Sequence, residues 1–122
     1  MNITTRAQDL EMSTSIDQFV RDQVRTALHH FREDILAVDV FMKDTNGPKG
    51  GVDKQALIRV RLRNRQVIAL ETAHDNLYAA VKKGTRRTKR AVRRQLRKSH
   101  RIQKQRMRDH LHDTDIVVAI TN

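Results

Sequence analysis

Residues 55–72, with the sequence QALIRVRLRNRQVIALET, contain two runs of strand-forming residues joined by a short polar link. In the first run, 55–63, apolar side chains alternate with Leu or Arg, and a period of two is typical of a half-buried strand. The second run, 67–72, follows Asn64-Arg65-Gln66, a link of hairpin length, so we expect the two runs to pair antiparallel. A similar period at 38–43 predicts another strand, and Ile3 begins a further short one.

Two segments on either side of these strands carry apolar residues at helical spacing. Ser13 is a favoured N-cap, and the apolar residues after it fall at steps of three, one and four, which predicts a helix over about 14–32. Asp75 is placed to cap a second helix, whose small and apolar residues from Leu77 to Ile102 share one side. We expect this second helix to continue to about residue 108.

The order strand, helix, three strands, helix predicts an α+β fold. The expected β-α-β-β-β-α arrangement is a two-layer sandwich with two helices on one face of a mostly antiparallel four-stranded sheet. A chain of 122 residues, 38% of them hydrophobic, fits one domain with an appendage, which we place at 1–100 and at a tail over 109–122. Within the tail, 115–120 suits an added strand, a docking peptide or a flexible end. Residues 46–51, NGPKGG, predict a loop.

The positive charge of the chain is concentrated in the second helix. Between Lys82 and Arg108 there are fourteen Lys and Arg and no acidic residue, whereas all 14 Asp and Glu lie elsewhere. The net charge of +11 is therefore local, and repulsion among these cations is most easily relieved by a polyanion such as nucleic acid. At 100° per residue, the cations fall mostly opposite the apolar side. Charge does not distinguish RNA from DNA.

Three other charged or polar patterns have alternative interpretations. One face of a predicted strand is lined by Arg59, Arg61 and Arg63. This face is either a second RNA contact or an ordinary polar face of the sheet. The basic helix also has the charge of a membrane-surface or calmodulin-binding segment, although its apolar side is thin. The residues from Asp109 to Asp113, with two histidines among them, suit zinc or nickel or are simply a polar tail.

The amino-acid composition excludes several classes of site and function. The absence of Cys excludes a disulfide framework, a thiolate zinc site and a cysteine nucleophile. We find neither a phosphate-binding loop nor a convergent nucleophile and base, so we expect no enzyme, cofactor, metal or small-molecule substrate. No apolar run is long enough for a membrane span and no leader is evident, so we expect a cytoplasmic protein that is monomeric in isolation. With few aromatic residues, backbone and shape recognition of nucleic acid is favoured over base stacking.

Three stretches in this order resemble one family. They are residues 10–20, LEMSTSIDQFV; the strands ending at Thr72; and residues 75–81, DNLYAAV, which are similar to the family segment Asp-Met-Tyr-Ala-Ala-Ile. Together they resemble the ribosome hibernation-promoting factor and ribosome-associated translation inhibitor family over roughly 1–100.

The resemblance implies a fold like that of double-stranded-RNA-binding domains. It also implies a partner, the small ribosomal subunit, on whose rRNA such a protein occupies the channel of messenger and transfer RNA and blocks initiation without catalysis. The family's basic positions fall on nine residues here, and the charged run adds Arg101. The expected RNA-binding residues are Arg21, Arg25, Lys82, Arg86, Lys89, Arg90, Arg93, Arg94, Arg97 and Arg101.

The chain departs from the family in three ways. Thr85 and Thr88 stand where larger apolar residues are usual, and the second helix is longer and more basic. The separate dimerisation domain of the long members has no counterpart, so the chain resembles the short class, and whether it pairs ribosomes or only silences single ones is open. The rival hypotheses are a general RNA or DNA chaperone or regulator without ribosome specificity, and a membrane-associated regulatory peptide carrier.

Overall fold

The computed structural model describes the backbone of residues 1–44 and 53–113 and the side chains of residues 1–44 and 53–110. The predicted order of elements is confirmed, with one additional 3-10 helix, η1. The elements are β1 (Asn2–Gln8), α1 (Thr14–Leu28), η1 (His29–Asp34), β2 (Ile35–Asp44), β3 (Lys54–Leu62), β4 (Val67–His74) and α2 (Leu77–Asp113).

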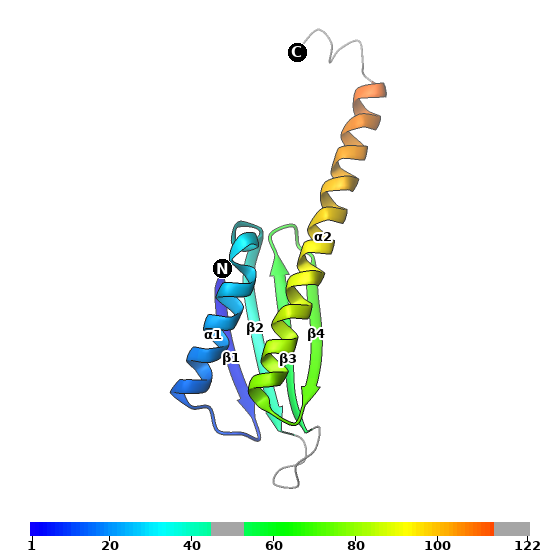
Figure 1. Ribbon diagram of the computed structural model, residues 1–122. Coiled ribbons are helices and arrows are strands. Elements are labelled where there is room, and N and C mark those ends of the chain that lie inside the picture. Colours follow the sequence, from blue (N-terminus) through cyan, green and yellow to red (C-terminus); the bar gives the residue numbers. More distant parts are fainter. Residues whose placement is uncertain (45–52, 114–122) are drawn as a thin grey trace. The chain divides into compact units, whose positions relative to one another are not determined.

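The four strands form one sheet in the order β1-β2-β3-β4. β1 is parallel to β2, while the β2–β3 and β3–β4 pairs are antiparallel. Figure 1 shows α1 and the first part of α2 on the same face of this sheet. The fold class expected from the sequence, an α+β sandwich with two helices on one face, is therefore confirmed.

Alternate side chains of the central strands build the core between the sheet and the helices. In β2 and β3 the helix-facing positions are at most 2% exposed, as the period of two requires. Helix α1 adds three buried side chains at steps of four, the stripe of an amphipathic helix. The main core residues are Val20, Val24, Leu28, Val38, Val40, Met42, Ile58, Val60, Leu62, Val81 and Val92.

Several element ends differ from the sequence prediction. The first helix was expected over 14–32, but α1 ends at Leu28, whose φ of −105° and ψ of 5° leave the α region. The tighter turns of η1 then bring Phe31 into the core, where it is 8% exposed. Strand β2 begins at Ile35 rather than 38, and the register shift between Ile35 and Ala37 leaves both of these side chains buried.

The start of α2 also differs, because Asn76 rather than Asp75 caps it. The Asn76 side-chain oxygen accepts a hydrogen bond from the Ala79 backbone N–H at 3.2 Å. The His74 Nδ1 in turn accepts from the Asn76 N–H at 3.1 Å. The helix therefore begins at Leu77, with its capping residue one position later than expected.

The chain divides into two compact units, Met1–Val92 and Arg93–Asn122, and α2 runs through both. Its end at Asp113 lies beyond the expected residue 108, so the first residues of the expected tail are helical. In the second unit every side chain from Arg101 to His110 is exposed, and Ile102, expected on the apolar side, is 42% exposed. The expected loop at 46–51 and the alternatives for 115–120 lie outside the described residues. The division at residue 100 stays a prediction.

Over 1–44 and 53–113 the structure has no helix that combines the length and the apolar character of a membrane span.

The assigned core predicts that two Leu→Ala substitutions differ sharply in their effect on the free energy of unfolding. Replacing Leu62, which is 2% exposed, by Ala leaves a cavity under the helices and lowers the free energy of unfolding by about 2–5 kcal/mol. Leu36→Ala, at a side chain 46% exposed, is the matched control and changes it much less. Urea denaturation measures both, and equal losses would contradict the assigned core.

Candidate nucleic-acid interface

Helix α2 is held against the sheet by a close approach at Gly84. A Cβ atom at this position would lie 3.0 Å from both Ile58 Cδ1 and Thr72 Oγ1, which is tighter than an ordinary contact, so a side chain there would have to displace these two neighbours slightly. The buried Thr72 hydroxyl donates to the Ala80 carbonyl at 2.9 Å. These two contacts fix which side of α2 faces the sheet.

The two threonines that depart from the family pattern belong to this buried side. Thr85 and Thr88 are 4% and 0% exposed. The Thr85 hydroxyl donates to the Lys82 carbonyl at 3.0 Å, whereas Thr88 Oγ1 has no hydrogen-bond partner within the described part of the chain. A buried hydroxyl without a partner is unfavourable, so this stretch packs less favourably than an apolar seam.

The cations of α2 in the first unit lie away from the buried side. Lys82, Arg86 and Arg90 are exposed and Lys89 is half-buried. Arg87 Nη1 donates to the Glu71 carbonyl of β4 at 3.2 Å. Over 1–44 and 53–110, none of these cations has a carboxylate within ion-pair distance. Their charge is therefore available to an external anion.

In the second unit all of the cations of α2 are exposed. Arg93, Arg94, Arg97 and Arg101 belong to the expected binding set. The nearest acidic residue along the helix is Asp109, whose carboxylate accepts from Gln105 Nε2 at 3.0 Å. Five cations separated by three or four residues share one helical face. They are Arg93, Arg97, Arg101, Lys104 and Arg108.

The two expected binding residues of α1 differ in their surroundings. Arg21 Nε lies 3.0 Å from Asp17 Oδ2, and Arg21 Nη1 donates to the Ile3 carbonyl of β1 at 2.8 Å. Arg25 makes a longer 3.4 Å contact with Asp22, and 58% of its side chain is exposed. Arg21 thus ties α1 to the edge strand, while Arg25 is the more accessible cation. Asp17 and Arg21 are four residues apart, a spacing that favours an ion pair on a helix and that the sequence prediction did not use.

Two ion-pair networks each shift the pKa of one side chain, Asp17 in one and Lys54 in the other. The pKa of Asp17 is lowered from its ordinary value of 3.8, mainly by the hydrogen bond from the Thr5 hydroxyl and then by that from Arg21. The pKa of Lys54 is raised, mainly by its hydrogen bond to Asp44 and then by Asp53. Both networks join different elements of the first unit.

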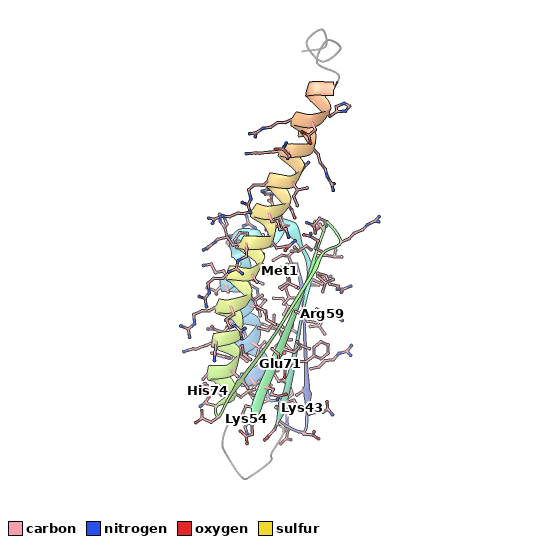
Figure 2. The ribbon with its side chains drawn as sticks, turned by 90° about the vertical axis from the view of Figure 1, so that its right-hand side faces the viewer. Met1, Lys43, Lys54, Arg59, Glu71 and His74 are labelled. Atoms are coloured by element: carbon pink, nitrogen blue, oxygen red, sulfur yellow. The ribbon has the colours of Figure 1, made fainter. Side chains whose placement is uncertain are left out.

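The arginines of β3 are partly neutralised by a residue that sequence reasoning missed. Arg59 Nη2 lies 3.2 Å and Arg61 Nε 3.9 Å from Asp39 Oδ2 of β2. Figure 2 shows Arg59 on the side of the sheet away from the helices. Arg63 lies beyond β3, and its Nε donates to the Glu33 carbonyl at 2.9 Å, so only two of the three expected strand arginines line this face. The register that pairs Asp39 with Arg59 was not readable from the sequence.

The histidine motif near the end of α2 adds no metal cluster to the described residues. Over these residues no group of three or more His, Cys, Asp or Glu side chains is placed to hold a metal ion. Asp109 and His110 belong to the helix, and the side chains of 111–113 lie outside the described part.

The Asp17 network predicts a pH-dependent stability difference. Because the folded-state pKa of Asp17 is lowered, its ionised form stabilises the fold above pH 3.8 and this contribution is lost as the pH falls through the folded-state pKa. Asp17→Asn is therefore less stable than the wild type near pH 7, and the difference shrinks toward pH 2. Thermal denaturation from pH 2 to 7 measures it, with Asp22→Asn as the control. A constant gap over this range would exclude the proposed pairing.

Comparison with known proteins identifies the family. The sequence model described as "Sigma 54 modulation protein / S30EA ribosomal protein" matches residues 3–100. The N-terminal domain of Protein Y from Thermus thermophilus is similar in structure, with a TM-score of 0.65 and 24% identity, over 77% of this chain and 98% of that one. A ribosomal subunit interface protein from Coxiella burnetii has a TM-score of 0.65 and 14% identity, over 77% and 96%.

Comparison with curated protein sequences gives no match. The two structural relatives share the fold, and the family match spans most of the chain, including the strands and much of α2. The family resemblance seen in residues 10–20 and 75–81 is thereby confirmed. The chain belongs to the family of the sigma 54 modulation protein and the S30EA ribosomal protein.

Proposed function

We propose that the protein is a ribosome hibernation factor that binds the small ribosomal subunit through its rRNA. It occupies the channel of messenger and transfer RNA and blocks initiation, acting in the cytoplasm without catalysis or a cofactor. Family membership supports association with the ribosome, and one relative of the same fold is described as a ribosomal subunit interface protein.

The observation that carries the proposal is the cationic side of α2. Its Lys and Arg side chains are exposed except for the half-buried Lys89, and those described have no carboxylate partner. Holding so many like charges together is unfavourable for the free protein. Phosphates placed against this side replace that repulsion with attraction and release condensed counterions. The residues proposed to contact rRNA are Arg21, Arg25, Lys82, Arg86, Lys89, Arg90, Arg93, Arg94, Arg97 and Arg101.

Inhibition by occupancy requires only affinity and volume. A folded domain placed where messenger and transfer RNA pass excludes them sterically, so no group with a catalytic geometry is needed. Arg21 contributes through its guanidinium only in part, because Asp17 and the Ile3 carbonyl already engage it. The α2 cations therefore supply most of the proposed contact.

A general nucleic-acid chaperone is the second candidate. The cations of 93–108 are exposed on more than one side of the helix, which favours contact with any phosphate backbone rather than one shaped site. Comigration with small subunits or whole ribosomes in a sucrose gradient distinguishes the two functions, since a general binder distributes over free RNA as well.

The first prediction from this proposal is a steep salt dependence. If on the order of six to ten phosphates are contacted, affinity for small subunits falls by about 10³ to 10⁵ between 50 and 200 mM salt. A KCl titration of binding to purified subunits measures the slope. A nearly flat profile would show that phosphates are not the main contact.

The second prediction separates binding from folding. A four-Glu variant, in which Arg86, Arg90, Arg93 and Arg97 are changed to Glu, no longer cosediments with ribosomes. It also no longer inhibits translation in vitro. Thermal stability is unchanged or raised, because mutually repelling exposed charges are removed.

A smaller matched comparison controls for net charge. The pair Arg86→Glu and Arg90→Glu weakens binding, whereas Arg32→Glu with Arg65→Glu, exposed cations of η1 and of the β3–β4 turn, has little effect. If the four-Glu variant still inhibits translation at wild-type concentrations, the cationic side of α2 is not the binding surface.

A further inference from the structure

The open face of the sheet carries a shallow hollow that the proposed rRNA contact does not use. It has a volume of about 410 Å³, and one row of cross-strand neighbours forms its centre. In this row Arg6 of β1 pairs with Phe41 of β2, Phe41 with Leu57 of β3, and Leu57 with Glu71 of β4. Lys43 and Gln55, which face each other across β2 and β3, line one side.

Phe41 gives the hollow a flat apolar surface. Its ring is half-buried, and the Arg6 guanidinium carbon lies 5.9 Å from the ring centroid. The three other aromatic side chains are engaged elsewhere: Phe19 and Tyr78 pack edge to face at 4.7 Å, and Phe31 is 8% exposed. Phe41 is therefore the aromatic ring of the open face. The exposed Arg6 guanidinium lies over this ring, so a nucleobase stacks on Phe41 by taking the place of Arg6.

The charges around Phe41 favour a phosphate-bearing ligand. Over residues 1–44 and 53–110, neither Arg6 nor Lys43 has a carboxylate within ion-pair distance. Arg59 on the same face differs, because Asp39 already pairs with it at 3.2 Å. Both cations line the hollow without a carboxylate partner, Arg6 over the aromatic ring and Lys43 beside the hollow's Gln55.

The polar groups on the other sides suit the edge of a base. The Gln55 amide offers both a donor and an acceptor, and the Glu71 carboxylate accepts from an exocyclic amino group. An apolar side chain of a partner protein would bury these groups without pairing them, which is unfavourable. The volume lies within the range of about 300–1,000 Å³ that small-ligand sites occupy.

We propose that this hollow binds one unpaired nucleotide of RNA. The base displaces the Arg6 guanidinium from the ring and stacks on Phe41. Arg6 and Lys43 then contact its flanking phosphates, and Gln55 and Glu71 hydrogen-bond its edge. The proposal deepens the proposed function, because the nucleotide belongs to the same RNA whose backbone α2 contacts, and it adds a site on the opposite face of the first unit.

The experiment compares two RNA probes and a small set of variants. The probes are a single-stranded oligoribonucleotide of mixed sequence and a blunt duplex of the same sequence. Phe41→Leu removes the ring but keeps an apolar side chain in β2, and it weakens single-strand binding about 5- to 100-fold while leaving duplex binding unchanged. Phe41→Tyr, which keeps a stacking face, retains wild-type affinity for the single strand.

Two further measurements exclude a folding defect as the cause. Arg6→Gln, at an exposed position of β1, weakens single-strand binding, whereas Val67→Ala, 56% exposed on the same face outside the hollow, does not. Ultraviolet cross-linking followed by mass spectrometry of the wild type places the cross-linked nucleotide on the peptide containing Phe41.

The outcomes separate this site from the proposed function. Unchanged single-strand affinity in Phe41→Leu overturns the nucleotide site. The nucleotide site is also overturned if Phe41→Leu loses binding to intact small subunits but keeps its affinity for protein-free rRNA. That result would mean that the hollow contacts a ribosomal protein rather than a nucleotide. Conversely, Phe41-dependent single-strand binding by a protein that fails to cosediment with ribosomes supports the hollow and rejects the ribosomal function.

Discussion

The close packing of α2 on the sheet at Gly84 is the constraint on which the exposed charges of the first unit depend. Ile58 and Thr72 both lie 3.0 Å from the position of a missing Cβ, so rotation of α2 that brought a larger residue to this point would crowd the sheet. The hydrogen bond from the Thr72 hydroxyl to the Ala80 carbonyl fixes the same rotation one turn earlier. Because the buried side is fixed in this way, the cations at positions such as 82, 86 and 90 necessarily face outward. A glycine and a threonine thus determine where the charge is presented.

The helices also protect the edges of the sheet with two arginines. Arg21 of α1 donates to the Ile3 carbonyl of β1, and Arg87 of α2 donates to the Glu71 carbonyl of β4. β1 and β4 are the outer strands, whose free backbone groups can pair with another chain. Each arginine occupies one carbonyl acceptor of an edge strand with a charged side chain, which disfavours such pairing. Not every arginine of a basic protein is therefore equally available for RNA, and charge counting along the sequence cannot make that distinction.

The sequence was sufficient for the order of elements because each element has a strong local period. The alternation in β3 and the spacing of Val20, Val24 and Leu28 in α1 needed no tertiary information. The end of α1 was not predictable in this way, because apolar spacing continues through η1 while the backbone tightens after Leu28. The neutralisation of Arg59 by Asp39 also depends on the pairing of β2 with β3. Scarcity of aromatic residues argued against stacking, yet only the register across four strands shows that Phe41 faces the open side.

In the proposed complex the two faces of the first unit contact different parts of one RNA. Contacts between exposed cations and phosphates act at a distance, carry little sequence information and weaken with salt. Contacts between an aromatic ring and a base act only when the base is unpaired and within reach, and they depend far less on ionic strength. A β-α-β-β-β-α domain separates these two chemistries by the thickness of its sheet, because both helices cover one face and leave the other open. The strength of binding and the choice of an RNA site with an accessible base can therefore be set by different residues. Arg86 and Arg90 project from α2, whereas Phe41 lies in the row of cross-strand neighbours on the open face.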